Sequence, residues 1–146
     1  MSEENVEVVR SFYESLNAWL ASYWSDPVVP IEESPELEEM FAHLDPEAEW
    51  DWLFSPETFR GRERLLQALG DYLETVGDWR VEVEELIDVS RNRVLGIGRV
   101  VARGKGSGTP VLQAIFSAFT LRNGKVTRIE DHTERAAAVA AAGLSE

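Results

Sequence analysis

The stretch Val111–His132 decides the fold; it reads VLQAIFSAFTLRNGKVTRIEDH. At its centre, Asn123-Gly124 favours a tight two-residue hairpin turn, because both residues adopt positive φ angles readily. β-branched and aromatic residues on both sides of the turn favour strands. Residues 111–122 and the residues that follow Gly124 are therefore predicted to be neighbouring antiparallel strands.

The segments before this hairpin extend the same sheet. From Trp79 to Val89 apolar residues alternate with charged ones, a period of two that predicts a half-buried strand. Residues 93–103 predict the next strand, and the glycine-rich residues 104–108 predict the turn after it. Together these segments predict an antiparallel meander.

Helical patterns lie upstream. A first helix is predicted from Ser2, which can cap its N-terminus, to Asp26-Pro27, which ends it. Residues 27–34 are predicted to form a loop. Ser34-Pro35 is a capping residue followed by the proline favoured at the first helical position, so a second helix is predicted to run to about Leu44.

A strand and a further helix are predicted between residues 45 and 78. Asp45-Pro46 predicts a turn, after which alternate residues share an apolar face that we expect to point inward. Those residues are Ala48, Trp50, Trp52 and Phe54. Gly61 precedes a helical pattern that ends at Gly77-Asp78, where glycine suits the left-handed position after a helix. An alanine-rich helix over Glu134–Ala142, stopped by Gly143, is predicted near the end of the sequence.

The order of these elements predicts an α+β fold in a single domain, residues 1–146, because helices and strands are segregated and the sheet is mostly antiparallel. Three or four helices are expected to cover the concave face of a curved sheet. The 146 residues are enough to build one hydrophobic core.

Composition narrows the possible partners. The formal net charge of −13 disfavours nucleic acid, whose phosphates bind lysine and arginine. No apolar run is long enough to span a bilayer, so no membrane is expected. The absence of cysteine and the acidic first residues, Met1–Asn5, predict a cytoplasmic protein without disulfides or thiolate metal sites.

Aromatic residues predict a small-molecule pocket. Trp50 and Trp52 offer more apolar surface than a short strand easily hides, so they are either pocket wall or plain core. Gly96 and Gly98 share a face of their strand, which indicates either a bend or room for a close approach. Both alternatives favour a concave sheet.

The strand over residues 111–122 is apolar on both faces, which predicts that a second surface covers its outer side. A homodimer through the outer face of the sheet would supply that cover. On the bulkier face, Gln113 and Ser117 are polar beside Phe119. Buried polar groups need partners, so both are candidates for ligand binding.

Asp131 is the candidate catalytic residue. Ile129 assigns its own face of the last strand to the interior, which places Asp131 at the end of that strand, facing an apolar cavity. Burial there would raise the pKa of the carboxyl and suit it to general acid–base work. The alternative is a structural carboxylate at the rim that caps the C-terminal segment or pairs with Arg99 or Arg135.

Other chemical signals are weak. His132 and His43 lie in different segments without the spacing of metal ligands, so no metal site is expected. Gly104–Gly108 lacks the Walker spacing and joins two strands, so it is predicted to be a hairpin turn and not a phosphate loop. No cofactor is expected.

Several motifs carry a resemblance to a known family. They are SEENVEVVR (Ser2–Arg10), LDPEAEW (Leu44–Trp50), FRGRE (Phe59–Glu63), FTLRNGKV (Phe119–Val126) and AAGL (Ala141–Leu144). In these motifs the chain resembles the SnoaL-like family, part of the superfamily named for nuclear transport factor 2 that also contains ketosteroid isomerases and limonene epoxide hydrolases. The resemblance implies a cone-shaped α+β barrel, commonly a homodimer, with a pocket between the long helix and the sheet.

The resemblance extends to ketosteroid isomerases, and it implies where three of their functional residues fall in this sequence. Their base aspartate falls at Trp50, which cannot take a proton. Their oxyanion-binding aspartic acid falls near Ser117, and their tyrosine near Tyr13 or Phe12. The resemblance therefore implies a hydrogen-bonding pair without the usual base.

Two other enzyme types give further expectations. Limonene epoxide hydrolases use an arginine and an aspartate two residues apart, but Val101 stands where that aspartate would follow Arg99. The fifth-strand aspartate of SnoaL-type cyclases falls near Asp131, so the resemblance points to the same carboxylate as the strand pattern.

The sequence thus supports two hypotheses. The first is a protein that binds a small, mostly apolar ligand between helices and sheet and, as an isomerase or cyclase, uses Asp131 as its acid–base group. Its ligand-binding residues would be Tyr13, Trp50, Trp52, Gln113, Ser117, Phe119 and Ile129. The second is a non-enzymatic dimerising or scaffold domain whose cavity is filled by its own side chains.

Overall fold

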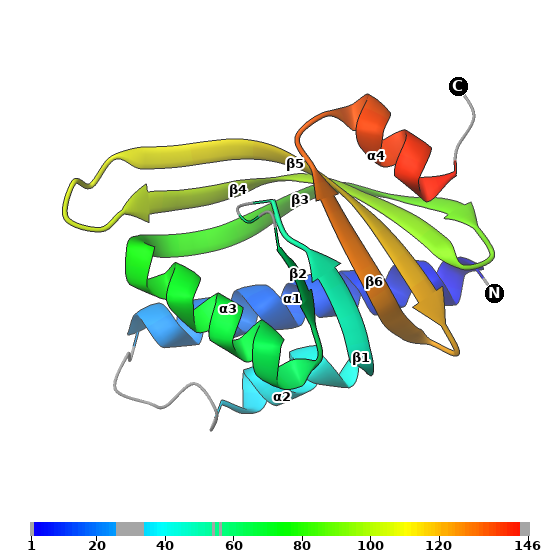
Figure 1. Cartoon of the computed structure of the whole chain (residues 1–146), viewed down its shortest axis with the longest axis horizontal. Coiled ribbons are helices and arrows are strands. Elements are labelled where there is room, and N and C mark those ends of the chain that lie inside the picture. The colour runs from blue at the N-terminus through cyan, green and yellow to red at the C-terminus, as the bar shows by residue number, and fades with distance from the viewer. Residues whose placement is uncertain (1, 26–33, 54, 56, 144–146) are drawn as a thin grey trace.

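The computed structural model, which describes residues 2–25, 34–53, 55 and 57–143, contains four helices and six strands (Figure 1). The helices are α1 (Ser2–Ser25), α2 (Pro35–Ala42), α3 (Arg62–Thr75) and α4 (Arg135–Ala142). The strands are β1 (Leu44–Asp51), β2 (Thr58–Arg60), β3 (Val76–Ser90), β4 (Arg93–Gly104), β5 (Pro110–Arg122) and β6 (Lys125–His132). Residues 27–33 of the predicted loop, and the inward side chain predicted for Phe54, lie outside the described residues.

The strands form one mixed sheet in the order β2-β1-β6-β5-β4-β3. Strands β3 to β6 form the predicted antiparallel meander. β1 pairs with β6 in parallel, and the short β2 pairs with β1 antiparallel. The sheet is not closed, and within the described residues β2 and β3 are its edges. The α+β fold class predicted from the sequence is confirmed.

The end signals of three elements are confirmed. Ser34 caps α2, since its Oγ accepts a hydrogen bond from the backbone N–H of Leu37 at 3.3 Å. Asn123 and Gly124 form the β5–β6 turn with φ angles of 53° and 76°. Gly143 ends α4 in the left-handed conformation, with a φ of 85°.

Two predicted boundaries were wrong. Asp45 and Pro46 lie inside β1, although the Asp45 carboxylate accepts a local hydrogen bond from the backbone N–H of Glu47 at 2.9 Å. The pairing of β1 with β6 shifts register in this region, which lets a proline sit in the strand. Gly77 does not end α3 in the left-handed region; β3 begins at Val76, and Asp78 has the positive φ, 52°.

The large core lies between the sheet and helices α1, α2 and α3. The helices contribute fully buried residues that include Phe12, Leu16, Leu37 and Leu69. α4 lies on the opposite face of the sheet, where Ala138 and Val139 pack with Leu95 and Ile97 of β4. Three helices therefore cover the inner face, while the fourth covers part of the outer face.

The two glycines of β4 meet different surroundings. A Cβ atom on Gly98 would overlap the backbone carbonyl oxygen of Glu82 on β3, where the pairing of the two strands shifts register between Val83 and Glu85. A Cβ atom on Gly96 would lie 2.9 Å from the hydroxyl of Tyr13. Gly98 therefore belongs to an irregularity of the sheet, and Gly96 makes room for a side chain of α1.

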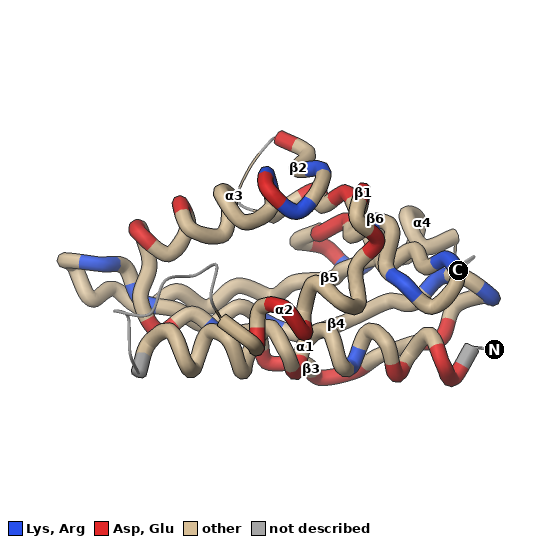
Figure 2. The backbone as a smooth tube through the Cα atoms, turned by 90° about the horizontal axis from the view of Figure 1, so that it is seen from below, with Lys and Arg blue, Asp and Glu red and all other residues tan. Residues whose placement is uncertain are grey.

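Acidic residues occur along the backbone of α1, β3 and α3 (Figure 2). Among the described helices, none combines the length and hydropathy that a transmembrane crossing requires.

Candidate functional site

Asp131 lies at the centre of a group of hydrogen bonds inside the large core. Its Oδ1 accepts from the Ser117 hydroxyl at 2.8 Å, and its Oδ2 accepts from the Trp50 indole N–H at 3.0 Å. The backbone N–H of Leu53 donates to the same Oδ2 at 3.4 Å. A carboxylate has about four acceptor positions, so these donors leave about one unused.

The strand order explains why these residues meet. Ser117 of β5 lies directly opposite Asp131 of β6 in the antiparallel pairing. Trp50 of β1 lies beside Ile129, which shares the inward face of β6 with Asp131. Three adjacent strands therefore deliver a hydroxyl, an indole and a carboxylate to one place.

Burial is the main cause that raises the pKa of Asp131 from 3.8 to about 6. The hydrogen bonds from Ser117, Trp50 and Leu53 oppose the rise because they stabilise the carboxylate, and the charge of Asp51 adds to it. The residue as a whole is half-buried, yet its carboxyl oxygens are enclosed by these donors. A pKa near 6 lets both protonation states be populated close to neutral pH.

Tyr13 reaches the same group from α1. Burial is the main cause that raises the pKa of its hydroxyl; the charge of Asp131 raises it further, and a hydrogen bond with Ser117 opposes the rise. Its ring contacts Phe12 and Phe119 edge to face, with centroids 5.7 and 5.5 Å apart. Tyr13 is therefore a neutral hydroxyl next to the carboxylate.

Aromatic and aliphatic side chains enclose these polar groups. The Trp50 ring lies 5.8 Å from Phe12 and 6.1 Å from Trp52, and the Trp52 ring lies 5.9 Å from Trp79. The cavity that remains measures about 20 Å³, which is room for about one water molecule. Its lining also includes Leu16, Val81, Val100, Ile115, Phe119 and Ile129. In this conformation the interior is filled by its own side chains.

Comparison with known proteins places the chain in a family. A family model described as the SnoaL-like domain matches residues 29–129. The chain belongs to this SnoaL-like family. No curated protein matches the chain in sequence.

Solved structures share the fold of this SnoaL-like chain. An NTF2-like protein of unknown function from Burkholderia pseudomallei has 18% identity and a TM-score of 0.71, covering 96% of this chain and 98% of its own. A putative SnoaL-like polyketide cyclase from Jannaschia has 18% identity and a TM-score of 0.69, over 99% and 94%. An LEH-like epoxide hydrolase from M. tuberculosis has 15% identity and a TM-score of 0.65, over 90% and 84%. At these identities the likeness shows the fold alone.

Most of the residues predicted for the site of this SnoaL-like chain line the small cavity. They are Tyr13, Trp50, Trp52, Ser117, Phe119, Ile129 and Asp131. Gln113 lies apart from them, half-buried farther along β5, where its amide donates to the backbone carbonyl of Ala114 at 2.9 Å. Arg99, which the sequence left as a possible ion-pair partner of Asp131, pairs instead with Glu82 at 2.7 Å.

Sequence reasoning missed two donors near the site. Trp79 lines the cavity, and its buried indole N–H has no hydrogen-bond partner among the described residues. Trp79 begins the segment in which apolar residues alternate with charged ones, and this pattern indicates an inward side chain. The backbone N–H of Leu53 carried no signal, because a backbone group has no residue identity.

Arg128 lies at the centre of a group of ion pairs outside this site. Arg128 of β6 binds Glu49 at 3.0 Å, Asp51, and Glu130 at 3.2 Å. Within the part of the chain that the structure describes, no three histidine, cysteine, aspartate or glutamate side chains are grouped to hold a metal ion.

Proposed function

We propose that this SnoaL-like protein binds a small, mostly apolar ligand between its helices and its sheet, in the cytoplasm, and that Asp131 acts on the ligand as a general acid–base group. The observation that carries the proposal is the enclosed Asp131 carboxyl with a pKa of about 6, held by two side-chain donors from neighbouring strands. A structural ion pair would instead hold the carboxyl ionised against a cation.

The chemistry that fits is removal of a proton from a carbon next to a carbonyl. The Asp131 carboxylate would take the proton, the electrons of the C–H bond would move into the carbonyl, and an enolate would form. The Ser117 hydroxyl would turn from Asp131 to donate a hydrogen bond to the enolate oxygen. Asp131 would then return the proton to the same or another carbon, as an isomerase or cyclase requires.

The test uses 2-tetralone, a flat ketone with an activated C–H bond. In deuterated water the protein should accelerate exchange of the α-hydrogens, followed by NMR, and Asp131→Asn should lose at least about 100-fold of that rate. The matched control is Asp88→Asn, which changes an exposed carboxylate on β3. Equal exchange rates in wild type and Asp131→Asn would rule out the acid–base role.

The small interior cavity favours a second candidate function, a scaffold whose core is simply filled. About 20 Å³ holds no flat ligand in the present conformation. On this alternative, aromatic ketones and phenols should leave the tryptophan fluorescence and the NMR spectrum of the protein unchanged at millimolar concentration.

We also propose that the protein forms a homodimer through the outer face of the sheet. Leu112 on that face is 66% exposed and Ala114 is exposed, so an apolar surface continues beyond the part that α4 covers. A second copy of this face would bury both residues.

A further inference from the structure

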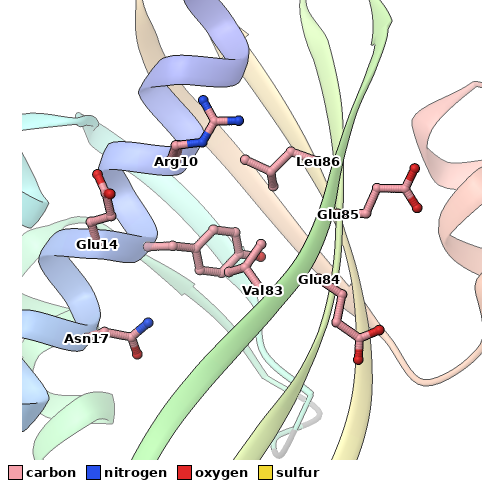
Figure 3. Close-up of a pocket in the computed structure, with 8 residues that line it drawn as sticks. Arg10, Glu14, Asn17, Val83, Glu84, Glu85 and Leu86 are labelled. Atoms are coloured by element: carbon pink, nitrogen blue, oxygen red, sulfur yellow. The ribbon is translucent and has the colours of Figure 1, made fainter.

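A groove of about 350 Å³ lies between α1 and the edge strand β3 (Figure 3). Arg10 and Asn17 extend from the helix toward the strand, and Val83 and Leu86 point back toward the helix. Glu84 and Glu85 point away from the helix. The inner walls of the groove are therefore partly apolar.

Two hydrogen-bonded tethers flank this groove. At one end the Asn17 amide donates to the backbone carbonyl of Val81 at 2.8 Å and accepts from its N–H at 2.9 Å. At the other end the Asn5 amide donates to the carbonyl of Arg91 at 2.6 Å. Between them β3 shifts register against β4 after Val83, and such an irregularity bends a strand. The helix is thus tied to β3 at one end of the groove and to the β3–β4 turn at the other.

Tyr13 is the residue that the groove and the interior cavity share in their linings. Its inner side faces Ser117 and Asp131, and it is 8% exposed. The ring lies over Gly96, with Phe12 and Phe119 edge-on beside it. These neighbours make an aromatic-sized slot that ends at the Asp131 group, and Tyr13 itself fills the slot.

We propose that the Tyr13 side chain occupies the place of the ligand: a flat ring bearing a neutral hydroxyl or carbonyl oxygen passes through the α1/β3 groove, and Tyr13 swings out into that groove. The ligand ring would then lie on Gly96, with its oxygen beside Ser117 and Asp131. This inference rests on the proposed function. It gives the ligand of that function the space that the small interior cavity lacks.

The shape and electrostatics of the slot select the chemical class of the ligand. Tyr13 shows that the slot accepts a six-membered aromatic ring with one oxygen at its inner end. Burial and the charge of Asp131 both disfavour a negative charge at that oxygen, as the raised pKa of the Tyr13 hydroxyl indicates. Neutral phenols and cyclic ketones should therefore bind, and benzoates should not.

The first test uses 4-methylphenol, which is the tyrosine side chain without its backbone, and follows the indole N–H signals of Trp50 and Trp79 by NMR. In Tyr13→Ala it should bind at least about tenfold more tightly than in wild type, because no ring must first be expelled. Toluene, which lacks the hydroxyl, should bind Tyr13→Ala about tenfold more weakly than 4-methylphenol.

Leu69→Ala is the matched control, since it empties space in α3 away from the slot and should leave the 4-methylphenol affinity at the wild-type value. If Tyr13→Ala does not fold, Tyr13→Val takes its place. In wild type, saturating 4-methylphenol should abolish the nuclear Overhauser contact between the rings of Tyr13 and Phe119. Persistence of that contact, or the absence of binding to wild type, would overturn the displacement.

The second test needs no ligand. Hydrogen exchange at the Trp50 indole N–H should slow several-fold in Val83→Phe, which narrows the groove where Val83 is 39% exposed. Leu112→Phe, the same kind of change on the outer face, should leave the rate unchanged. Equal rates in the two variants would overturn the groove as the route. Failure of the 2-tetralone reaction alone would remove the proposed catalysis and leave the slot and the route standing.

Discussion

The carboxyl of the half-buried Asp131 has a pKa set by two opposing effects. Three donors surround it, and in solvent such donors would lower the pKa of a carboxyl. Here desolvation outweighs them, so the pKa rises to about 6. The site keeps a carboxyl whose proton is easily gained and lost, and this is the property that acid–base chemistry needs.

We predict a specific pH dependence of stability from this residue. Because the folded pKa lies above the unfolded value of 3.8, the folded state binds the proton more tightly, and stability should fall as pH rises from about 4 to about 6. The loss is at most about 3 kcal/mol, since one pKa unit corresponds to about 1.4 kcal/mol.

Urea unfolding of wild type and Asp131→Asn across this pH range checks the prediction. The free energy of unfolding of wild type, relative to that of Asp131→Asn, should fall over the range and level off above about pH 6. A difference that stays constant would contradict the assigned pKa shift.

A second prediction concerns the glycines of β4. Gly98→Ala should destabilise the protein by about 3 kcal/mol or more, because the new Cβ meets the rigid backbone carbonyl of Glu82. Gly96→Ala should cost about 1–2 kcal/mol, because the Tyr13 hydroxyl is the end of a side chain that can move. Urea denaturation ranks the two variants, and equal costs would contradict this difference between backbone and side-chain contacts.

At the scale of elements, α1 takes the place of a missing neighbouring strand. β3 is an edge of the sheet, and edge strands expose unpaired backbone groups. The Asn17 side chain binds both the N–H and the carbonyl of Val81, as the backbone of an adjacent strand would. One amide thereby fixes the long helix to the sheet on one side of the α1/β3 groove.

We predict that Asn17→Leu lowers the free energy of unfolding by about 1–3 kcal/mol, because both backbone groups of Val81 lose their partners. The exchange rate of the Val81 amide proton should rise with it. Asn5→Leu is the control; its single hydrogen bond is exposed, so the cost should stay within about 0.5 kcal/mol. Equal costs for the two variants would show that Asn17 is not a special tether.

At the scale of the whole molecule, the sequence predicted the features that depend on residues close together in the chain. The Asn123-Gly124 turn, the Ser34 cap and the inward face of Ile129 and Asp131 each depend on neighbouring residues, and each is confirmed as geometry. The parallel pairing of β1 with β6 joins distant segments and leaves no local signal. The cavity volume depends on side-chain rotamers, so the sequence indicated aromatic walls without indicating how little space remains between them.

The net charge leads to a prediction about assembly. Two copies that each carry a charge of −13 repel each other, and salt screens that repulsion. The proposed homodimer should therefore tighten as sodium chloride rises from about 0.05 to about 0.5 M, as measured by analytical ultracentrifugation. Leu112→Glu on the proposed interface should be monomeric throughout, and a wild-type protein that is monomeric at every salt concentration would exclude the dimer.

The pairing of Trp50 with Asp131 also has a consequence for synthesis on the ribosome. The two residues are 81 positions apart, and β6 must leave the ribosome before β1 gains its parallel neighbour. During that interval the nascent chain carries Trp50 and Trp52 without the strand and the carboxylate that later cover them. The hydrogen bonds around Asp131 should therefore be among the last parts of the protein to form, and chaperones that bind exposed aromatic segments should recognise β1 while translation is still under way.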